Sequence, residues 1–183
     1  MLPSVNFWDY EHIAGISGAF KGVEIDLITE ILKDWQQSPG EPYTLLELRD
    51  GKTLVSFAII HRVSGRNFTF DIRFIVLDRD YRTGTAIQHL FQMIDDELLK
   101  KLPFAVIRIE ISTTKINSLG DEALENAGYC QVGHIPGYYG ENDDFYLYIR
   151  AIFRKPPNFI KISKPFEDDL SSAAPLEELH AQD

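Results

Sequence analysis

The stretch from residue 70 to residue 90 could bind phosphate through its backbone. An apolar strand is followed by a charged turn that contains Gly84, and then by a helical pattern. The first amide N–H groups of a helix have no acceptor within the helix, and with the helix dipole they attract phosphate or pyrophosphate. A strand, a turn and a helix in this order also occur without any ligand, so the pattern alone indicates only a candidate anion site.

A second group of residues could bind a cationic amine. Tyr138, Tyr139, Asp143 and Asp144 fall in the expected connection between the last two strands. Aromatic faces and carboxylates together suit a cation, although a polar loop that only joins two strands explains the same residues equally well. The 5 histidines are scattered without the spacing of metal ligands, so we expect no metal site.

Apolar periodicity and turn signals predict the elements that position these groups. We expect strands at residues 5–8, 43–48, 53–60, 68–77, 106–111, 129–135 and 145–153, and helices at residues 23–35, 86–100 and 117–127. The first helix should bury Val23, Leu27, Ile28, Ile31, Leu32 and Trp35. Turns at residues 50–51 and 64–67 make three strands an antiparallel meander, and the helix at 86–100 makes the strands that flank it parallel neighbours. The predicted fold class is α/β, with a mixed, mostly antiparallel sheet flanked by helices.

The chain of 183 residues has the composition of one soluble domain, with 44% hydrophobic and 25% charged residues. Its longest apolar runs fall far short of the ~20 residues of a membrane helix, and its first residues do not resemble a secretory signal. The lone cysteine, Cys130, fits a reducing cytoplasm and is expected to be buried in a strand. We expect a cytoplasmic protein that binds no membrane and no nucleic acid, since a net charge of −10 would repel a phosphate polyanion.

Charge divides the chain into a domain and an extension. Residues 167–183 hold six acidic residues and no Lys or Arg. The composition of residues 156–183 also offers little apolar surface to bury. We therefore expect residues 1–155 to form the domain, and residues 156–183 to form a C-terminal extension that is disordered toward its acidic end.

The order of several short motifs resembles the Gcn5-related N-acetyltransferase (GNAT) superfamily over roughly residues 5–153. One branch reads G-x-F and E-x-L-x-D in its first helices, T-W-D-L-x-W-I-x-V before the cofactor turn, V-E-T-S-S on a later strand and F-Y-x-x-G-D-D-x-x-x-Y near its end. The residues at these places are Gly18, Phe20, Glu24, Glu30, Leu32, Asp34, Thr69, Phe70, Asp71, Ile72, Phe74, Ile75, Leu77, Ile109, Glu110, Ile111, Ser112, Thr113, Tyr138, Tyr139, Asn142, Asp143, Asp144 and Tyr148.

The resemblance implies transfer of an acetyl group from acetyl-coenzyme A to a primary amine by direct attack. The pantetheine arm would lie along Phe74, Ile75 and Val76, and a strand N–H near Ile75 or Val76 would polarise the thioester carbonyl. The other cofactor-binding residues would be Arg82, Thr83, Gly84, Thr85, Ala86 and Ile87 around the pyrophosphate, together with Asn117. A small-molecule or peptide amine would bind near Asp71, Tyr138, Asp143 and Asp144, and the chain could form a homodimer.

Direct attack requires an amine that has lost its ammonium proton. Glu110 aligns with the glutamate of V-E-T-S-S and is the first candidate for the catalytic base. The alternative is a glutamate on a solvent-facing side of a strand. Asp71 is the second candidate, and a cross-strand pair with a basic residue would explain it equally well.

The cofactor turn departs from the family pattern Q/R-x-x-G-x-G/A. Aligned without gaps, Arg82 takes the first place, and Thr85 and Ile87 take the small places. Shifted by one residue, Gly84 and Ala86 take the small places. Because N–H groups supply the contacts, a distorted turn could still bind the cofactor.

A second departure concerns the proton donor. Leu124 stands where many family members carry a tyrosine that protonates the departing thiolate. Tyr138, Tyr139 or solvent would have to supply that proton. Two alternatives to an enzyme therefore remain open. One is a non-catalytic domain of this fold that binds coenzyme A as a ligand, and the other is a protein-interaction domain without a cofactor.

Overall fold

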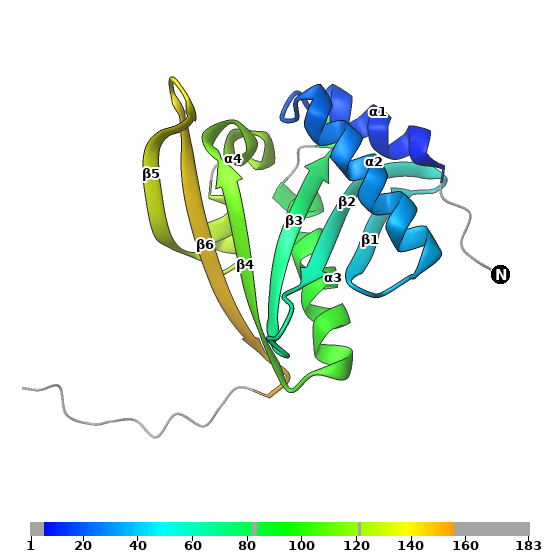
Figure 1. Ribbon diagram of the computed structural model, residues 1–183, viewed down its shortest axis with the longest axis vertical. Helices are drawn as coiled ribbons and strands as arrows, with labels where there is room; N and C mark the ends of the chain where they lie inside the picture. Colours follow the sequence, from blue (N-terminus) through cyan, green and yellow to red (C-terminus); the bar gives the residue numbers. More distant parts are fainter. Residues whose placement is uncertain (1–5, 82–83, 121, 156–183) are drawn as a thin grey trace, which may run out of the picture.

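The computed structural model describes residues 6–81, 84–120 and 122–155, and it places helices on both faces of one sheet (Figure 1). The helices are α1 (Phe7–Ser17), α2 (Gly22–Gln37), α3 (Gly84–Lys101), α4 (Thr113–Leu119) and α5 (Ala123–Asn126), with a 3₁₀ helix, η1 (Arg79–Tyr81). The strands are β1 (Tyr43–Asp50), β2 (Thr53–Arg62), β3 (Thr69–Leu77), β4 (Phe104–Ser112), β5 (Cys130–Gly140) and β6 (Asp143–Phe153). Among the described residues, no helix is long and apolar enough to cross a membrane.

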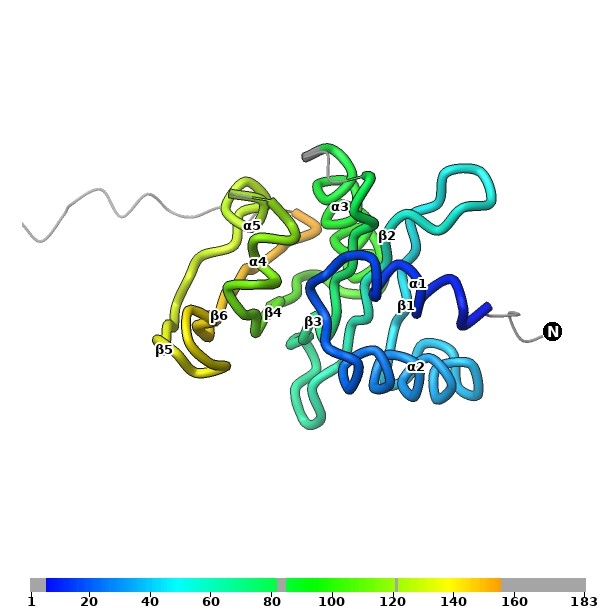
Figure 2. Tube along the Cα trace, turned by 90° about the horizontal axis from the view of Figure 1, so that it is seen from above, coloured from blue at the N-terminus to red at the C-terminus, as the bar shows by residue number. Residues whose placement is uncertain are grey.

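The six strands form a single sheet in the order β1-β2-β3-β4-β6-β5. All neighbours are antiparallel except β3 and β4, which are parallel. Helix α3, which lies between β3 and β4 in the chain, covers one face, whereas α1 and α2 cover the other face of β1 to β3 (Figures 1 and 2). The predicted mixed sheet with one parallel crossover is confirmed.

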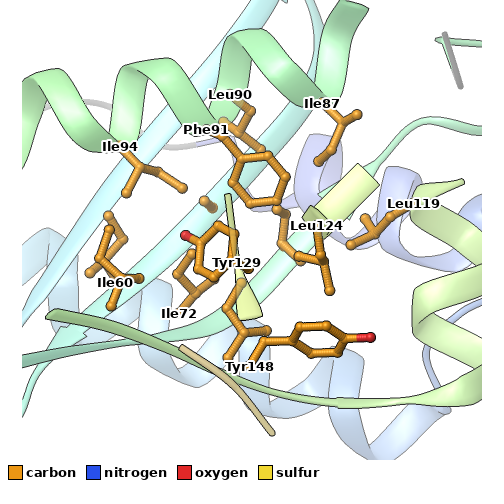
Figure 3. Close-up of a cluster of buried hydrophobic side chains, with 14 of the residues drawn as sticks. Ile60, Ile72, Ile87, Leu90, Phe91, Ile94, Leu119, Leu124, Tyr129 and Tyr148 are labelled. Carbon is orange, nitrogen blue, oxygen red and sulfur yellow. The ribbon is translucent and has the colours of Figure 1, made fainter. Parts of the chain in front are cut away.

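Strand β2 is buried on both faces from Leu54 to Ile60, and apart from the buried Ser56 this run is apolar. In β2, Phe57 and Ile59 face α1 and α2, whereas Ala58 and Ile60 face α3. Figure 3 shows part of the cluster on the α3 face. Two separate apolar clusters thus hold the helices on opposite faces of the sheet.

Strands β3 and β4 pair only over their first residues and then part. The last pair of partners is Ile72 and Ile109. At the same point, Ile72 and Phe74 pair with Ile60 and Ile59, which are consecutive residues of β2. Arg73 is therefore the extra residue of a β-bulge. A bulge bends its strand, and the two strands diverge beyond this point (Figure 1). The sheet therefore has an opening between β3 and β4.

The connection between the last two strands is shorter than predicted. Tyr138 and Tyr139 belong to β5, and Asp143 and Asp144 belong to β6, so their placement in a loop is wrong. The prediction ends the strand at residue 135 because Pro and Gly follow it. An irregularity in the β5 to β6 register absorbs these residues, and the strands meet in a tight turn where Asn142 has a φ of 61°.

The strand predicted at residues 5–8 is also wrong where the structure describes it. Phe7 and Trp8 open α1. Tyr10, Ile13 and Ala14 follow at helical spacing and are buried. Burial of this face outweighs the strand preference of the two aromatic residues.

Helix α2 confirms the helix predicted at residues 23–35, but its buried face is narrower than predicted. Ile28, Ile31 and Leu32 are buried. Val23 and Leu27 are 71% and 40% exposed. Trp35 is half-buried, and none of these three side chains belongs to the apolar cluster beneath α2.

The predicted helix at residues 117–127 is two short helices, α4 and α5. Gly120 has a φ of 96° and ends α4, because the left-handed region favours glycine. Cys130 is exposed rather than buried. It begins β5, which lies at the edge of the sheet beside β6 alone.

Candidate functional site

A cleft lies on the α2 face of the sheet, at the opening between β3 and β4. It consists of two adjoining pockets of about 190 Å³ and 320 Å³ that share Glu24, Lys115 and Tyr139. The smaller pocket is also lined by Leu27, Asp71, Ile72, Arg73, Phe74 and Glu110. The larger pocket is also lined by Gly18, Ala19, Phe20, Lys21, Ser112, Thr114 and Asp143. We call the two pockets together the α2–α4 cleft.

Two helix starts place Glu24 and Lys115 on opposite walls of this cleft. In the first turn of α2, Oε2 of Glu24 accepts the backbone N–H of Lys21 at 2.9 Å. In the first turn of α4, Oγ of the N-cap residue Ser112 accepts the backbone N–H of Lys115 at 3.3 Å. The Lys115 ammonium forms an ion pair with Glu24 and lies 5.2 Å from the ring centre of Phe20. The starts of α2 and α4 are therefore joined across the cleft.

Asp71 and Arg108 pair across β3 and β4 just before these strands part. Nε and Nη2 of Arg108 donate to the two carboxylate oxygens of Asp71 at 2.7 Å and 3.0 Å. Hydrogen bonding to this carboxylate raises the pKa of Arg108. Asp71 thus has the cross-strand partner that the sequence allows as the alternative to a catalytic base.

Glu110 lies two residues beyond Arg108 on the same face of β4. Its side chain is exposed and lines the smaller pocket beside Phe74 and Tyr139. No side chain in the described part of the chain forms a hydrogen bond or ion pair with Glu110. Its carboxylate is therefore available to a ligand in the cleft, in contrast to that of Asp71.

The two candidate tyrosines differ in their position relative to the cleft. Tyr139 lines both pockets. Tyr138 is 61% exposed and packs edge-on against Tyr139, with 4.9 Å between ring centres. Burial, followed by the negative charge of Glu110, raises the pKa of Tyr139. The Tyr139 phenol consequently stays protonated at neutral pH.

The two candidate aspartates have different surroundings. Asp143 lines the larger pocket and accepts the Thr114 N–H at 3.1 Å. The carboxylate of Asp144 instead accepts the Gly137 N–H at 2.8 Å and lies 2.8 Å from Nε2 of His134. The Gly137 hydrogen bond is the largest cause of the lowered pKa of Asp144. Asp144 thus fixes the β5–β6 hairpin and does not line the cleft.

Backbone hydrogen bonds show which edge of β3 faces the opening. The Val76 carbonyl accepts the Ser56 hydroxyl at 2.7 Å. The Asp78 N–H donates to the Val55 carbonyl at 2.9 Å. Both partners belong to β2, and backbone polar groups alternate in direction along a strand. The N–H of Ile75 therefore faces the opening, while that of Val76 faces β2.

Solved structures with the same arrangement establish the fold. A GNAT-family protein from Desulfovibrio desulfuricans has a TM-score of 0.70 at 14% identity, over 82% of this chain and 94% of its own. The ribosomal-protein-S18-alanine N-acetyltransferase of Escherichia coli has a TM-score of 0.64 at 21% identity, over 86% of this chain and 94% of its own. The chain has the GNAT fold.

A third similar structure, from Salmonella typhimurium, contains acetyl-coenzyme A as its cofactor. Its TM-score is 0.59 at 13% identity, over 84% of this chain and 94% of its own. No protein-family model matches the chain, and no curated protein matches it in sequence. The fold therefore rests on these structures, while the roles of single residues rest on the geometry of this chain.

The expected GNAT cofactor turn is only partly described. Arg82 and Thr83 lie outside the described residues. Helix α3 begins at Gly84, directly followed by the exposed Thr85 and the half-buried Ala86. The next residue, Ile87, is buried in the α3-side cluster, so only its backbone can face a ligand. Asn117, on α4, is exposed and lines neither pocket of the α2–α4 cleft.

Leu124 lies in the apolar interior. Its side chain is 4% exposed, and Figure 3 shows it close to Leu119 and Tyr148. The three side chains also line a pocket of about 80 Å³ beside α5. Leu124, which the sequence resemblance aligns with an expected proton-donating tyrosine, is thus part of the core.

Lys115 is a site residue that the sequence does not predict. The N-cap spacing from Ser112 to Lys115 places Lys115 in a first helical turn. Nothing local indicates that this turn faces Glu24, which lies 91 residues earlier in the chain.

Among residues 6–81, 84–120 and 122–155, no group of three or more His, Cys, Asp or Glu side chains could hold a metal ion.

Proposed function

We propose that this chain is an N-acetyltransferase that moves an acetyl group from acetyl-coenzyme A to a primary amine bound in the α2–α4 cleft. The observation that carries the proposal is the opening between β3 and β4. It sets the Ile75 N–H on the β4-facing edge of β3 and leads to a cleft that contains Glu110. The acetyl-coenzyme A in the Salmonella structure supports the choice of donor.

The donor would bind along β3 and the start of α3. Ile75 and Leu77 direct their backbone groups into the opening, where amides of the pantetheine arm would pair with them as a neighbouring strand does. The first N–H groups of α3 would bind the pyrophosphate. The proposed donor-binding residues are Phe74, Ile75, Val76, Arg82, Thr83, Gly84, Thr85, Ala86, Ile87 and Asn117.

Glu110 would remove the ammonium proton of the acceptor. The neutral nitrogen then attacks the thioester carbonyl carbon, and the Ile75 N–H stabilises the oxyanion that forms. As the tetrahedral intermediate collapses, the C–N bond remains and the C–S bond breaks with its electron pair on sulfur. Tyr139, which stays protonated at neutral pH, would supply a proton to the thiolate. The second proton of the nitrogen, lost as the amide forms, would return to the Tyr139 phenolate through water, and Glu110 would release the first proton to solvent.

Asp143 would bind the acceptor directly, because it lines the larger pocket. The other proposed acceptor-site residues would not contact the acceptor but would position the groups that do. Asp71 holds β3 to β4, Tyr138 packs on Tyr139, and Asp144 fixes the hairpin that carries both tyrosines. A cationic amine between Asp143 and Glu110 suits these charges.

Calorimetry and a thiol-release assay test this function. Acetyl-coenzyme A should bind the full chain, and an amine panel should include an acceptor whose acetylation releases free thiol. Glu110→Gln should lower turnover by about 10²-fold or more without weakening donor binding. The loss should shrink at high pH, where the amine is already neutral. Glu30→Gln, an exposed change on α2, is the matched control. No donor binding at millimolar concentration would refute the proposal.

A non-catalytic domain that binds coenzyme A is the second candidate. The buried Leu124 favours it, because this residue cannot donate a proton to the departing thiolate. This candidate predicts donor binding without thiol release, both in the wild-type chain and in Leu124→Tyr. Turnover that depends on Glu110 excludes it.

A further inference from the structure

Lys115 brings a primary amine into the α2–α4 cleft. Its side chain is 23% exposed and lines both pockets. In the smaller pocket it is accompanied by Glu110 and Phe74. Lys21, by comparison, is exposed and lines only the larger pocket. Lys115 is therefore the lysine that shares a pocket with the proposed base.

The ion pair of Lys115 with Glu24 also spans the opening in the sheet. Helix α2 packs with α1 over the part of the sheet that ends at β3, whereas α4 directly follows β4. Beyond Ile72 and Ile109 these two strands are no longer paired with each other. The contact between the starts of α2 and α4 thus fastens two parts of the sheet that diverge. We call the Glu24–Lys115 ion pair the clasp.

We propose that Lys115 is a self-acetylation site and that its acetylation releases the clasp. This inference rests on the proposed function, because it uses the same acyl-thioester donor and the same base. It adds a substrate within the chain itself. The amine is held in the cleft by the fold and does not have to be captured from solution.

The chemistry balances with one equivalent of acetyl-coenzyme A. Glu110 takes a proton from the Lys115 ammonium through water in the shared pocket. The neutral Nζ attacks the acetyl carbonyl carbon, a C–N bond forms, and the C–S bond breaks with its electron pair on sulfur. The thiolate takes its proton from Tyr139, and the second proton of Nζ, which is lost as the amide forms, passes through water to the Tyr139 phenolate. Glu110 then releases the first proton to solvent. The products are an uncharged Nε-acetyl-lysine and free coenzyme A.

Acetylation would change the charge of the cleft. The charged lining residues are the acids Glu24, Asp71, Glu110 and Asp143 and the bases Lys21, Arg73 and Lys115. Four acids would then face two bases instead of three. Glu24 would lose its ionic partner, and the ammonium of an acceptor could take that place. The modification would thus prepare the cleft for cationic amines.

Peptide mapping by mass spectrometry tests the modification. The full chain is incubated with acetyl-coenzyme A, or with coenzyme A as a control, without any other amine. Acetylation of Lys115 should be more than about 10-fold faster than that of Lys33, an exposed lysine on α2. Its rate constant should not depend on protein concentration. Glu110→Gln should slow the acetylation of Lys115 by about 10²-fold and leave the acetylation rate of Lys33 unchanged. Lys33→Arg should leave the acetylation rate of Lys115 unchanged.

Equal rates at Lys115 and Lys33 would overturn the inference, and so would a rate constant that rises with protein concentration. Acetylation of added amines without acetylation of Lys115 would refute self-acetylation alone. Failure of acetyl-coenzyme A to bind would refute both this inference and the proposed function.

Hydrogen exchange tests the clasp separately. Lys115→Gln resembles the acetylated side chain, whereas Lys115→Arg keeps the charge. The glutamine variant should exchange amides in the first turns of α2 and α4 several-fold faster than the arginine variant. Equal exchange in the two variants would overturn the role of the clasp.

Discussion

The ion pair between Asp71 and Arg108 should stabilise the sheet at the point where β3 and β4 part. The two hydrogen bonds measure 2.7 Å and 3.0 Å, and the Asp71 and Arg108 side chains are 20% and 29% exposed. A hydrogen bond to a charged group contributes about 1.5–3 kcal/mol, whereas an exposed ion pair contributes about 0.2–1 kcal/mol. The geometry is bidentate and the exposure partial, so we expect a contribution of about 1–3 kcal/mol.

Asp71→Asn should therefore lower the free energy of unfolding by about 1–3 kcal/mol, because its amide directs N–H groups at the guanidinium. For a chain of this size the melting temperature should fall by about 2–12 °C. Urea and thermal denaturation followed by circular dichroism measure both quantities. Arg108→Met and the double variant complete a cycle whose coupling energy should reach about 1 kcal/mol or more. Glu97→Gln removes an exposed pair with Lys100 and should leave the melting temperature within error.

A coupling energy within error of zero would refute this reasoning. The pH dependence of turnover is a second test. If Asp71 has only a structural role, Asp71→Asn should leave the pH profile of turnover unchanged in the folded enzyme. If Asp71→Asn removed the acidic limb of that profile, where the base becomes protonated, without lowering the melting temperature, Asp71 and not Glu110 would be the base.

Three further substitutions test other parts of the structure. The Gly137 N–H lowers the pKa of Asp144 below 3.8. The stabilisation that the ionised Asp144 contributes is therefore complete above pH 3.8 and is lost as the pH falls through the lowered pKa. Thermal scans across this range should show that acid lowers the melting temperature of Asp144→Asn less than that of the wild-type chain. Asp95→Asn removes the carboxylate that pairs with Arg150, whose side chain is 11% exposed, and urea unfolding should show a loss of about 3 kcal/mol. Leu124→Tyr should cost about 1–3 kcal/mol through overpacking, while the thiol-release assay should show unchanged or higher turnover.

Most of the fold follows from local sequence patterns. The turns at residues 50–51 and 64–67 predict two antiparallel pairs, and both are present. The helix predicted at residues 86–100 is α3, which buries Ile87, Leu90 and Phe91 as its spacing indicates. The errors occur where packing overrides the local pattern: Phe7 and Trp8 favour a strand in isolation, but they open a helix whose later residues bury an apolar face.

The candidate site follows from the sequence only in part, because its contacts cross between distant elements. Asp71 is predictable as a strand residue that needs a basic partner, yet only the register of β3 with β4 identifies Arg108. Tyr138 and Tyr139 are adjacent and chemically alike, and their packing alone separates them. The partnership of Glu24 with Lys115 depends on how far β3 and β4 diverge, which no local motif specifies.

The divergence depends on Arg73, whose role as a bulge cannot be recognised from its residue type. Before the bulge, Ile72 faces α3; after it, Phe74 faces α2, although strict alternation would put both on one face. The same shift reverses the direction of the backbone groups. It turns the N–H of Ile75 toward the opening and that of Val76 toward β2. The sequence allows either residue as the donor to a thioester carbonyl, and a single extra residue in β3 distinguishes between them.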